Sequence, residues 1–293
     1  MINFRIGLFN YSLLFLIGLI WSASFLFIKI SVITIPPYTL TAGRLGVAVL
    51  ALTLYSFLRG YPLPTDARSW GIFAFIGLFG NALPFTLIGW GETHIDSGLA
   101  AVLMGIMPVS TVLLAHLFIP EEPFTVRKGL GITLSFGGLL TLVGLGALSG
   151  YSALAVAQLA VLTGAMSYAV VTIFVRRYAQ LPGPTMSLGA VLMGFIWVLP
   201  LSLVIDQPWT INPHFSGIAS LIILGLFSTA LASIIYFFLL PRIGATNFSQ
   251  VNYLTPVLGA IWGIIFLGEK ITTQLVMALI LVLVGIAVVT RSR

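Results

Sequence analysis

Gly77-Leu78-Phe79 recurs in this chain as Gly225-Leu226-Phe227, 148 positions later (225 − 77). The same register, without a gap, matches Ala82-Leu83 with Ala230-Leu231, Pro108-Val109 with Pro256-Val257, Phe118 with Phe266, Glu121 with Glu269, Thr125 with Thr273 and Gly137 with Gly285. Self-similarity at one fixed spacing indicates an internal duplication. The sequence therefore predicts two related halves, residues 1–148 and residues 149–293.

The composition places both halves in a membrane. Hydrophobic residues make up 59% of the 293 residues and charged residues only 7%, with a mean hydropathy of +1.13. A soluble domain carries about 25% charged residues, so this chain lacks the side chains needed to cover a globule in water. Cysteine is absent, which excludes disulfides and thiol catalysis. The three histidines are scattered at His94, His116 and His214, so we expect no metal site and no cofactor.

Apolar segments long enough to cross a bilayer follow one another with short connections. A transmembrane helix needs about 20 mostly apolar residues. Ten segments meet this requirement: 12–34, 37–58, 70–92, 96–118, 124–145, 153–175, 184–206, 217–239, 245–267 and 272–290. The first segment lacks a small-residue cleavage site after it and is expected to be a retained helix.

The basic residues predict the orientation of these spans. With ten spans, ten of the thirteen Lys and Arg residues fall on one side of the membrane: Arg5, Arg59, Arg68, Arg127, Lys128, Arg176, Arg177, Arg242, Arg291 and Arg293. The other side has Lys29 and Lys270, and Arg44 lies within a span. By the positive-inside rule both termini are cytoplasmic. The net charge of +6 is thus explained by topology, and no nucleic-acid partner is expected.

An odd number of spans in each half inverts the second copy relative to the first. The predicted fold is therefore an all-α membrane protein of ten transmembrane helices, arranged as two inverted five-helix repeats. Exchanging the conformations of two such repeats turns a cavity from one side of the membrane to the other. The duplication thus favours a secondary transporter that works by alternating access.

Three segments carry a family resemblance. They are Ile20-Trp-Ser-Ala-Ser-Phe-Leu-Phe-Ile-Lys29, Thr246-Asn-Phe-Ser-Gln-Val-Asn-Tyr-Leu-Thr-Pro-Val257 and Phe266-Leu-Gly-Glu-Lys-Ile-Thr272. Together with the five-plus-five duplication they resemble the EamA branch of the drug/metabolite transporter superfamily, and within it the YddG-type bacterial amino-acid exporters. The first half departs from the pattern, because Ile119-Pro-Glu-Glu-Pro123 stands where the family usually has Leu-Gly-Glu.

The resemblance implies a multi-pass protein of the bacterial inner (plasma) membrane, not an enzyme. Its implied function is export of amino acids, aromatic or neutral ones first, and of related small metabolites from the cytoplasm. Its implied partners are a small-molecule substrate and the lipid bilayer, and the chain is expected to work as a monomer or weak homodimer.

Polar and aromatic side chains near mid-depth mark the expected substrate site, because polarity there is costly and tends to face a cavity or another helix. The first, third, fourth, sixth, eighth and ninth spans carry such side chains, whereas the fifth, seventh and tenth are almost purely apolar. We expect the first group to line a cavity and the fifth, seventh and tenth spans to be outer or packing helices, with the fifth and tenth at the periphery or at a subunit contact. The predicted substrate-binding residues are Trp21, Ser24, Asn81, Tyr168, Thr229, Gln250, Asn252 and Tyr253. Each also has a structural interpretation, namely helix packing or a hydrogen bond to its own helix.

Two prolines and two charges complete the expected site. Pro108 and Pro256 occupy matched positions in the two halves, so they are candidate hinges or, equally, static kinks. Arg44 is the one charge well inside a span and is expected in a vestibule, paired with Glu92 or Asp96 or attracting a substrate carboxylate.

Several alternatives stay open at this stage. The carboxylates all fall at span ends or in loops, which weakens a proton-coupled exporter of cationic drugs, although coupling through Glu92, Asp96 or a histidine stays open. A sugar-phosphate exporter would need several cations in the cavity, and only Arg44 is intramembrane. A membrane-embedded lipid-modifying enzyme would need a nucleophile–base or metal constellation, and no such motif is present.

Overall fold

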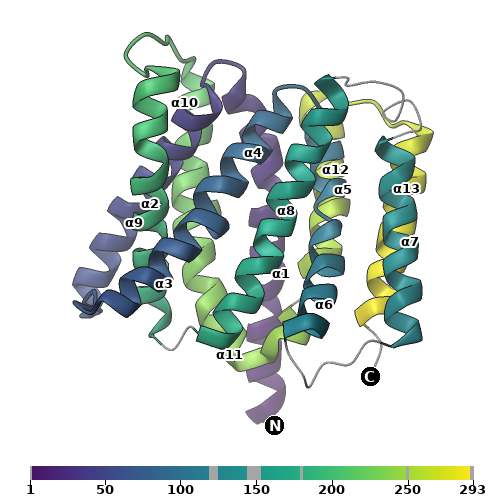
Figure 1. Cartoon of the computed structure of the whole chain (residues 1–293), viewed down its shortest axis with the longest axis horizontal. Coiled ribbons are helices and arrows are strands. Elements are labelled where there is room, and N and C mark those ends of the chain that lie inside the picture. The colour runs from purple at the N-terminus through teal and green to yellow at the C-terminus, as the bar shows by residue number, and fades with distance from the viewer. Residues whose placement is uncertain (1, 119–124, 144–152, 179–180, 249–250, 291–293) are drawn as a thin grey trace.

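The protein is an all-helical bundle throughout the residues that its structure, a computed structural model, describes: 2–118, 125–143, 153–178, 181–248 and 251–290 (Figure 1). In chain order the elements are α1 (Ile2–Val32), α2 (Pro37–Arg59), α3 (Ala67–Gly77), η1 (Leu78–Ala82), α4 (Leu83–Glu92), α5 (Ser97–Leu103), α6 (Ile106–Phe118), α7 (Val126–Val143), α8 (Ala153–Tyr178), α9 (Gly183–Leu201), η3 (Ser202–Asp206), α10 (Phe215–Ile223), η4 (Leu224–Leu231), α11 (Ala232–Phe248), α12 (Val251–Leu267) and α13 (Thr273–Thr290). The three η elements are π-helical turns between α-helices.

Within the described residues, seven helical segments are long and apolar enough to cross a membrane, and two shorter apolar helices follow them. The seven are Gly7–Val32, Pro37–Arg59, Ala67–Glu92, Ser97–Phe118, Ala153–Tyr178, Gly183–Asp206 and Phe215–Leu239, and the shorter two are Leu254–Leu267 and Thr273–Val288. The chain is thus a multi-pass membrane protein, and the number of ten crossings stays a prediction. One predicted boundary is wrong, because α11 continues to Phe248 through the expected break near residue 240.

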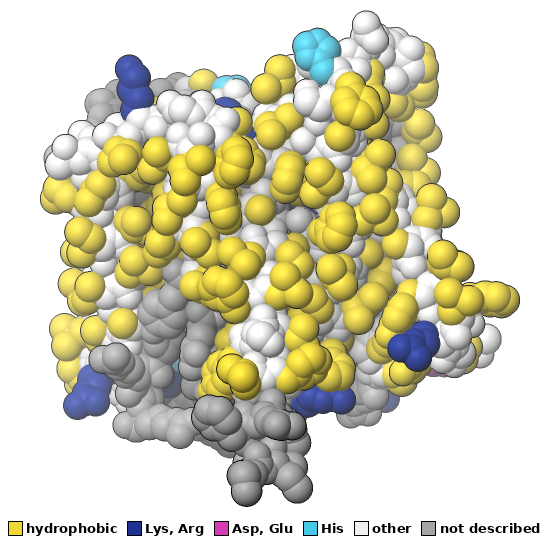
Figure 2. Space-filling model, turned by 180° about the vertical axis from the view of Figure 1, so that it is seen from behind, with side chains coloured by type: hydrophobic (Ala, Val, Ile, Leu, Met, Phe, Trp, Pro, Cys, Tyr) yellow, Lys and Arg dark blue, Asp and Glu magenta, His cyan; other side chains and the backbone are white. Residues whose placement is uncertain are grey.

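The surface matches the apolar composition. Large hydrophobic side chains stand far out of the protein, with Phe57 at 80% and Phe215 at 85% exposure. Figure 2 shows hydrophobic side chains across the middle of one face, with most of its Lys and Arg along the lower edge. That edge is the end of the bundle at which α1 begins and α13 ends, here called the termini end. A broad apolar band between polar edges is what a bilayer requires of the surface that it contacts.

The helices α7 and α13 form a pair at one side of the bundle (Figure 1). Each packs chiefly against the other, and Gly138 and Gly285 lie where their backbones meet. A Cβ at Gly138 would stand 3.0 Å from the Ala278 carbonyl oxygen. Small residues of this kind let membrane helices approach closely. The fifth and tenth predicted spans therefore lie at the periphery, as the sequence indicates.

The duplicated Gly-Leu-Phe motif has the same packing role in both halves. Gly77 lies against α9, where an added Cβ would stand 2.6 Å from the backbone nitrogen of Gly194. Gly225 lies against α2, where the added Cβ would stand 2.6 Å from the Cβ of Val47. Each glycine thus brings its own helix into backbone contact with a helix of the other half.

The end of the bundle opposite the termini, here called the far end, is held by hydrogen bonds between the halves. The Glu269 carboxylate accepts hydrogen bonds from the Ser97 backbone N–H at 2.7 Å and the Gly98 N–H at 2.8 Å, so it caps the start of α5. The Thr39 N–H donates to the Asp206 carboxylate at 2.7 Å. Charge-assisted bonds to helix N-termini are among the stronger hydrogen bonds.

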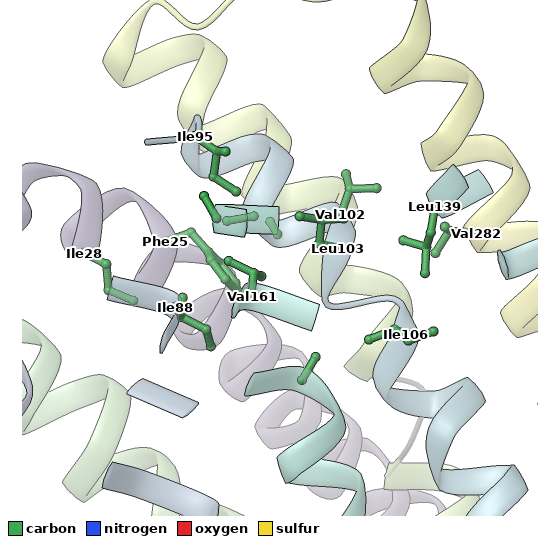
Figure 3. Close-up of a cluster of buried hydrophobic side chains, with 14 of the residues drawn as sticks. Phe25, Ile28, Ile88, Ile95, Val102, Leu103, Ile106, Leu139, Val161 and Val282 are labelled. Carbon is green, nitrogen blue, oxygen red and sulfur yellow. The ribbon is translucent and has the colours of Figure 1, made fainter. Parts of the chain in front are cut away.

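A hydrophobic cluster lies beneath these bonds. Figure 3 shows Phe25 and Ile28 of α1 beside Ile88 of α4 and Val161 of α8.

At the termini end, Asp66 caps α3 by accepting the Ser69 N–H at 2.8 Å. That hydrogen bond lowers the pKa of the exposed Asp66 carboxyl below its usual value.

Candidate functional site

A cavity of about 240 Å³ lies at the centre of the bundle, lined from α1, α2, α3 to α4, the α5–α6 junction, α8, α9, η4 to α11, and α12. Pockets for drug-sized ligands usually measure about 300–1,000 Å³. The cavity therefore suits a small metabolite. It reaches Asn252, which is the second residue of α12 at the termini end. Toward the far end it stops at Ile28 and Ile88, one turn before α1 and α4 end.

Most of the predicted substrate-binding residues meet at this cavity. Trp21, Ser24, Asn81, Tyr168, Thr229 and Asn252 all line it. Gln250 lies outside the described residues, and so does the side chain of Tyr253. Of the two predicted hinges, Pro256 lines the cavity and Pro108 is buried in α6 away from its wall.

One wall of the cavity was not predicted from the sequence, because we expected the seventh span to be an outer or packing helix. Instead, Ser187, Ala190 and Val191 of α9 line the cavity. The sequence feature that indicates this wall is the run of small residues in α9, which lets the helix lie close to its neighbours. A Cβ at Gly194 would stand 3.0 Å from the Gly77 carbonyl oxygen. Polarity alone, on which the prediction was based, does not reveal a wall made by small side chains.

Two of the three π-helical turns, η1 and η4, place polar groups on the cavity at equivalent positions of the halves. The turn η1 carries Asn81, and η4 carries Ser228 and Thr229. Asn81 donates from Nδ2 to the Ala190 carbonyl at 3.3 Å, and the Ser167 hydroxyl donates to the Phe79 carbonyl at 2.5 Å. A π-turn widens the helix by one residue and often occurs at functional sites. The duplicated motif therefore builds both the helix contacts and the polar patches of the cavity.

Aromatic rings form much of the remaining wall. Trp21 lies 6.4 Å from Tyr236 and 6.0 Å from Phe248, measured between ring centroids. Phe85 lies 6.5 Å from Tyr168 on the other side. These separations are within the range in which aromatic rings attract one another. The wall is thus largely apolar.

Arg44 brings a positive charge into this apolar cavity. It is buried, its Nε donates to the Thr229 hydroxyl at 2.7 Å, and its guanidinium carbon lies 3.7 Å from the centre of the Phe85 ring. A weaker contact of 3.5 Å joins Nη2 to the Ser228 carbonyl. The expected ion pair with Glu92 or Asp96 is absent from the described part of the chain. The reason is depth: Glu92 lies beyond the cavity at the end of α4, whereas Arg44 lines the cavity itself.

No group of three His, Asp or Glu side chains that could hold a metal ion occurs among the described residues. The groups that the cavity offers to a solute are one cation, several hydroxyls and amides, and aromatic faces.

A helical membrane bundle with an apolar perimeter and a polar patch in a central cavity has the architecture of a solute transporter. The sequence profile of the EamA-like transporter family matches this chain twice, over residues 8–144 and 155–291. The chain therefore belongs to the EamA-like transporter family, within the drug/metabolite transporter superfamily, and is a transporter and not an enzyme.

Named relatives are distant but match over most of their length. The chain is 26% identical to the uncharacterized inner membrane transporter YedA of Escherichia coli (strain K12), over 99% of this chain and 94% of the relative. It is 26% identical to a probable terminal-alkyne amino-acid exporter of Streptantibioticus cattleyicolor, over 85% of this chain and 82% of the relative. A protein of known crystal structure shares the fold, with a TM-score of 0.70 and 20% identity over 97% of this chain and 99% of its own.

Proposed function

We propose that this protein is a secondary transporter that exports amino acids, or related metabolites with a carboxylate, from the cytoplasm. The observation that carries the proposal is Arg44, a buried cation on the cavity with no acidic partner among the described residues. A buried charge is costly unless an opposite charge or hydrogen bonds compensate it. A guanidinium also suits a carboxylate geometrically, because its N–H groups match the two oxygens. The amino-acid exporter among the relatives supports the same substrate class.

The wall favours an aromatic or neutral side chain on the solute. Trp21, Phe85, Tyr168 and Tyr236 present rings to the cavity, and Arg44 is its one charged lining residue among those described. A sugar phosphate carries about two negative charges, which a single arginine compensates poorly. An uncharged or aromatic amino acid places its carboxylate at Arg44 and its side chain against the rings.

The arrangement of the bundle supports alternating access between two inverted repeats, residues 1–148 and 149–293. The far end is held by bonds from Glu269 and Asp206, while the cavity extends to Asn252 at the termini end. With the predicted orientation, in which both termini are cytoplasmic, this conformation faces the cytoplasm and receives solute there. The implied location is the inner membrane of a bacterium.

Counterflow in proteoliposomes tests the proposal. Vesicles are preloaded with a mixture of unlabelled amino acids, and uptake of trace radiolabelled phenylalanine, tryptophan or leucine is followed. We expect saturable, transient accumulation that excess unlabelled amino acid competes away. Phenylalaninamide, which lacks the carboxylate, should compete poorly. Absence of uptake for every amino acid by monodisperse protein would overturn the assignment, and competition by phosphorylated sugars would favour the rival substrate class.

Pro256 provides a test of the conformational cycle. The helix α12 runs unbroken through Pro256, which lines the cavity, whereas the matching Pro108 follows a break between α5 and α6 at Met104-Gly105. A mid-helix proline lacks one backbone hydrogen bond, so bending there is easier. We expect Pro256→Ala to lower the maximal counterflow rate several-fold and to change the half-saturating concentration by less than about twofold. Equal losses in both parameters would indicate a static kink that shapes the cavity.

A further inference from the structure

The last side chain of α4, Glu92, is a carboxyl group that the cavity does not use. It is fully buried, with 0% exposure, and neither of its carboxyl oxygens has a hydrogen-bond partner among the described residues. Phe85 and Ile88 precede it by seven and four residues and both line the cavity. Residues at these spacings share one face of a helix. Glu92 therefore continues the cavity-lining face of α4 by one turn toward the far end.

The charged groups around Glu92 are engaged with other partners. Lys29 of α1 donates from Nζ to the backbone carbonyls of Glu92 and Ile95, at 2.7 and 2.8 Å, and not to the carboxylate. The Glu269 carboxylate, before α13, accepts from Ser97 and Gly98. Arg44 of α2 is held by Thr229.

The other helices packed against α4 add no charge at this depth. The helix α5 has no titratable side chain. On α8, residues Ala157 and Val161 lie against Gly91, while its titratable groups, Tyr168, Arg176, Arg177 and Tyr178, lie at its middle and its termini end. Lys29, Arg44 and Glu269 are thus the charged neighbours of Glu92.

This environment favours the neutral form of the carboxyl group. An ionised carboxylate without partners in an apolar interior costs several kcal/mol, and such a group takes up a proton instead. Glu92 is buried at the far end, which the hydrogen bonds of Lys29 and Glu269 hold together. Opening of the far end would admit water and let the carboxyl ionise.

We propose that Glu92 is a proton-binding site that couples solute export to proton movement in the opposite direction. The idea rests on the proposed function. Glu92 takes a proton from water when the far end is open, and neutralisation allows the far end to close around it. When solute binds from the termini end, water reaches Glu92 from the cavity, which ends one turn away at Ile88, and the carboxyl gives its proton to that water. The carboxylate is then unstable in the closed far end, which opens and releases the solute. One proton thus crosses toward the cytoplasm for each solute exported.

Proteoliposomes with the membrane potential clamped at zero test the coupling. An acidic lumen drives protons outward and should accumulate radiolabelled phenylalanine about tenfold per pH unit in a one-for-one exchange. Glu92→Gln cannot ionise and mimics the protonated form, so it should lose this accumulation, leaving a ratio near one, and should also slow counterflow of phenylalanine several-fold because the loaded far end opens less readily. Asp96→Asn is the matched control, because Asp96 is four residues away and exposed, and it should retain the tenfold ratio. Full accumulation in Glu92→Gln would overturn the proposal.

A measurement without transport keeps the test independent of the solute. Infrared spectra of wild-type protein at neutral pH should contain the C=O band of a protonated carboxyl, which Glu92→Gln lacks and Asp96→Asn retains. A wild-type spectrum without that band would also overturn the proposal. Wild-type protein that shows counterflow but no response to a pH gradient refutes the coupling alone. Wild-type protein without counterflow for any amino acid refutes the proposed function, whereas the infrared band still reports on Glu92.

Discussion

Replacing Arg44 with methionine is expected to weaken binding of an amino-acid substrate about ten- to hundredfold. Methionine fills a similar volume but removes the cation that lines the cavity. Hydrogen bonds to a charged group contribute about 1.5–3 kcal/mol, which corresponds to this change in affinity. The half-saturating concentration in counterflow, measured with radiolabelled phenylalanine, reports it.

Two comparisons separate this effect from a general loss of structure. Arg44→Lys keeps a charge but loses the planar fork and the contact with the Phe85 ring, so it should recover only part of the affinity. Arg59→Met, at the exposed end of the same helix, should leave the half-saturating concentration unchanged. Phenylalaninamide should compete equally poorly against wild type and Arg44→Met. An unaltered half-saturating concentration in Arg44→Met would remove Arg44 from the substrate site.

Replacing Gly77 with valine is expected to destabilise the folded bundle by about 3 kcal/mol, the upper end of what overpacking costs. The first added carbon would stand 2.6 Å from the Gly194 nitrogen and 2.8 Å from the Ala190 carbonyl oxygen. These are backbone atoms, so relief requires α3 and α9 to separate. We expect the midpoint of thermal unfolding of the detergent-solubilised protein to fall by roughly 5–10 °C.

Glycines elsewhere in the chain provide the controls. Gly71 lies in the same helix α3, and an added Cβ there meets nothing within 4 Å, so Gly71→Val should leave the midpoint almost unchanged. Gly225→Val should reproduce the loss, because the added carbon would meet Val47 at 2.6 Å and the Arg44 carbonyl oxygen at 2.8 Å. A Gly77→Val midpoint equal to that of wild type would show that the two helices are not held together by this contact.

Much of the architecture follows from the sequence, because a bilayer imposes simple requirements. Apolar runs of about 20 residues separated by charges predict helices, and the all-helical bundle agrees with them. The 148-residue register (225 − 77) predicts two related halves, and the family profile matches twice, over 8–144 and 155–291. Apolar composition alone predicted that the fifth and tenth spans lie outside the cavity, and α7 and α13 do so.

Depth along a helix also follows from sequence, and it identified most of the cavity residues. Trp21, Ser24, Asn81, Tyr168 and Thr229 are near the middle of their spans, and each lines the cavity. A polar or large aromatic side chain at mid-depth avoids lipid, so it faces the interior of the bundle. This constraint requires no knowledge of which helices are neighbours.

The tertiary structure alone decided which residues face one another. It placed α9 in the wall, separated Arg44 from Glu92 and left the Glu92 carboxyl buried without a hydrogen bond. The sequence determined that two duplicated, helical halves lie in a membrane, because hydropathy and periodicity depend only on residues close along the chain. The pairing of distant residues depends instead on how closely two helices approach and how each is rotated about its axis. Contacts such as that of Gly77 with Gly194 determine both, and they form only in the folded bundle.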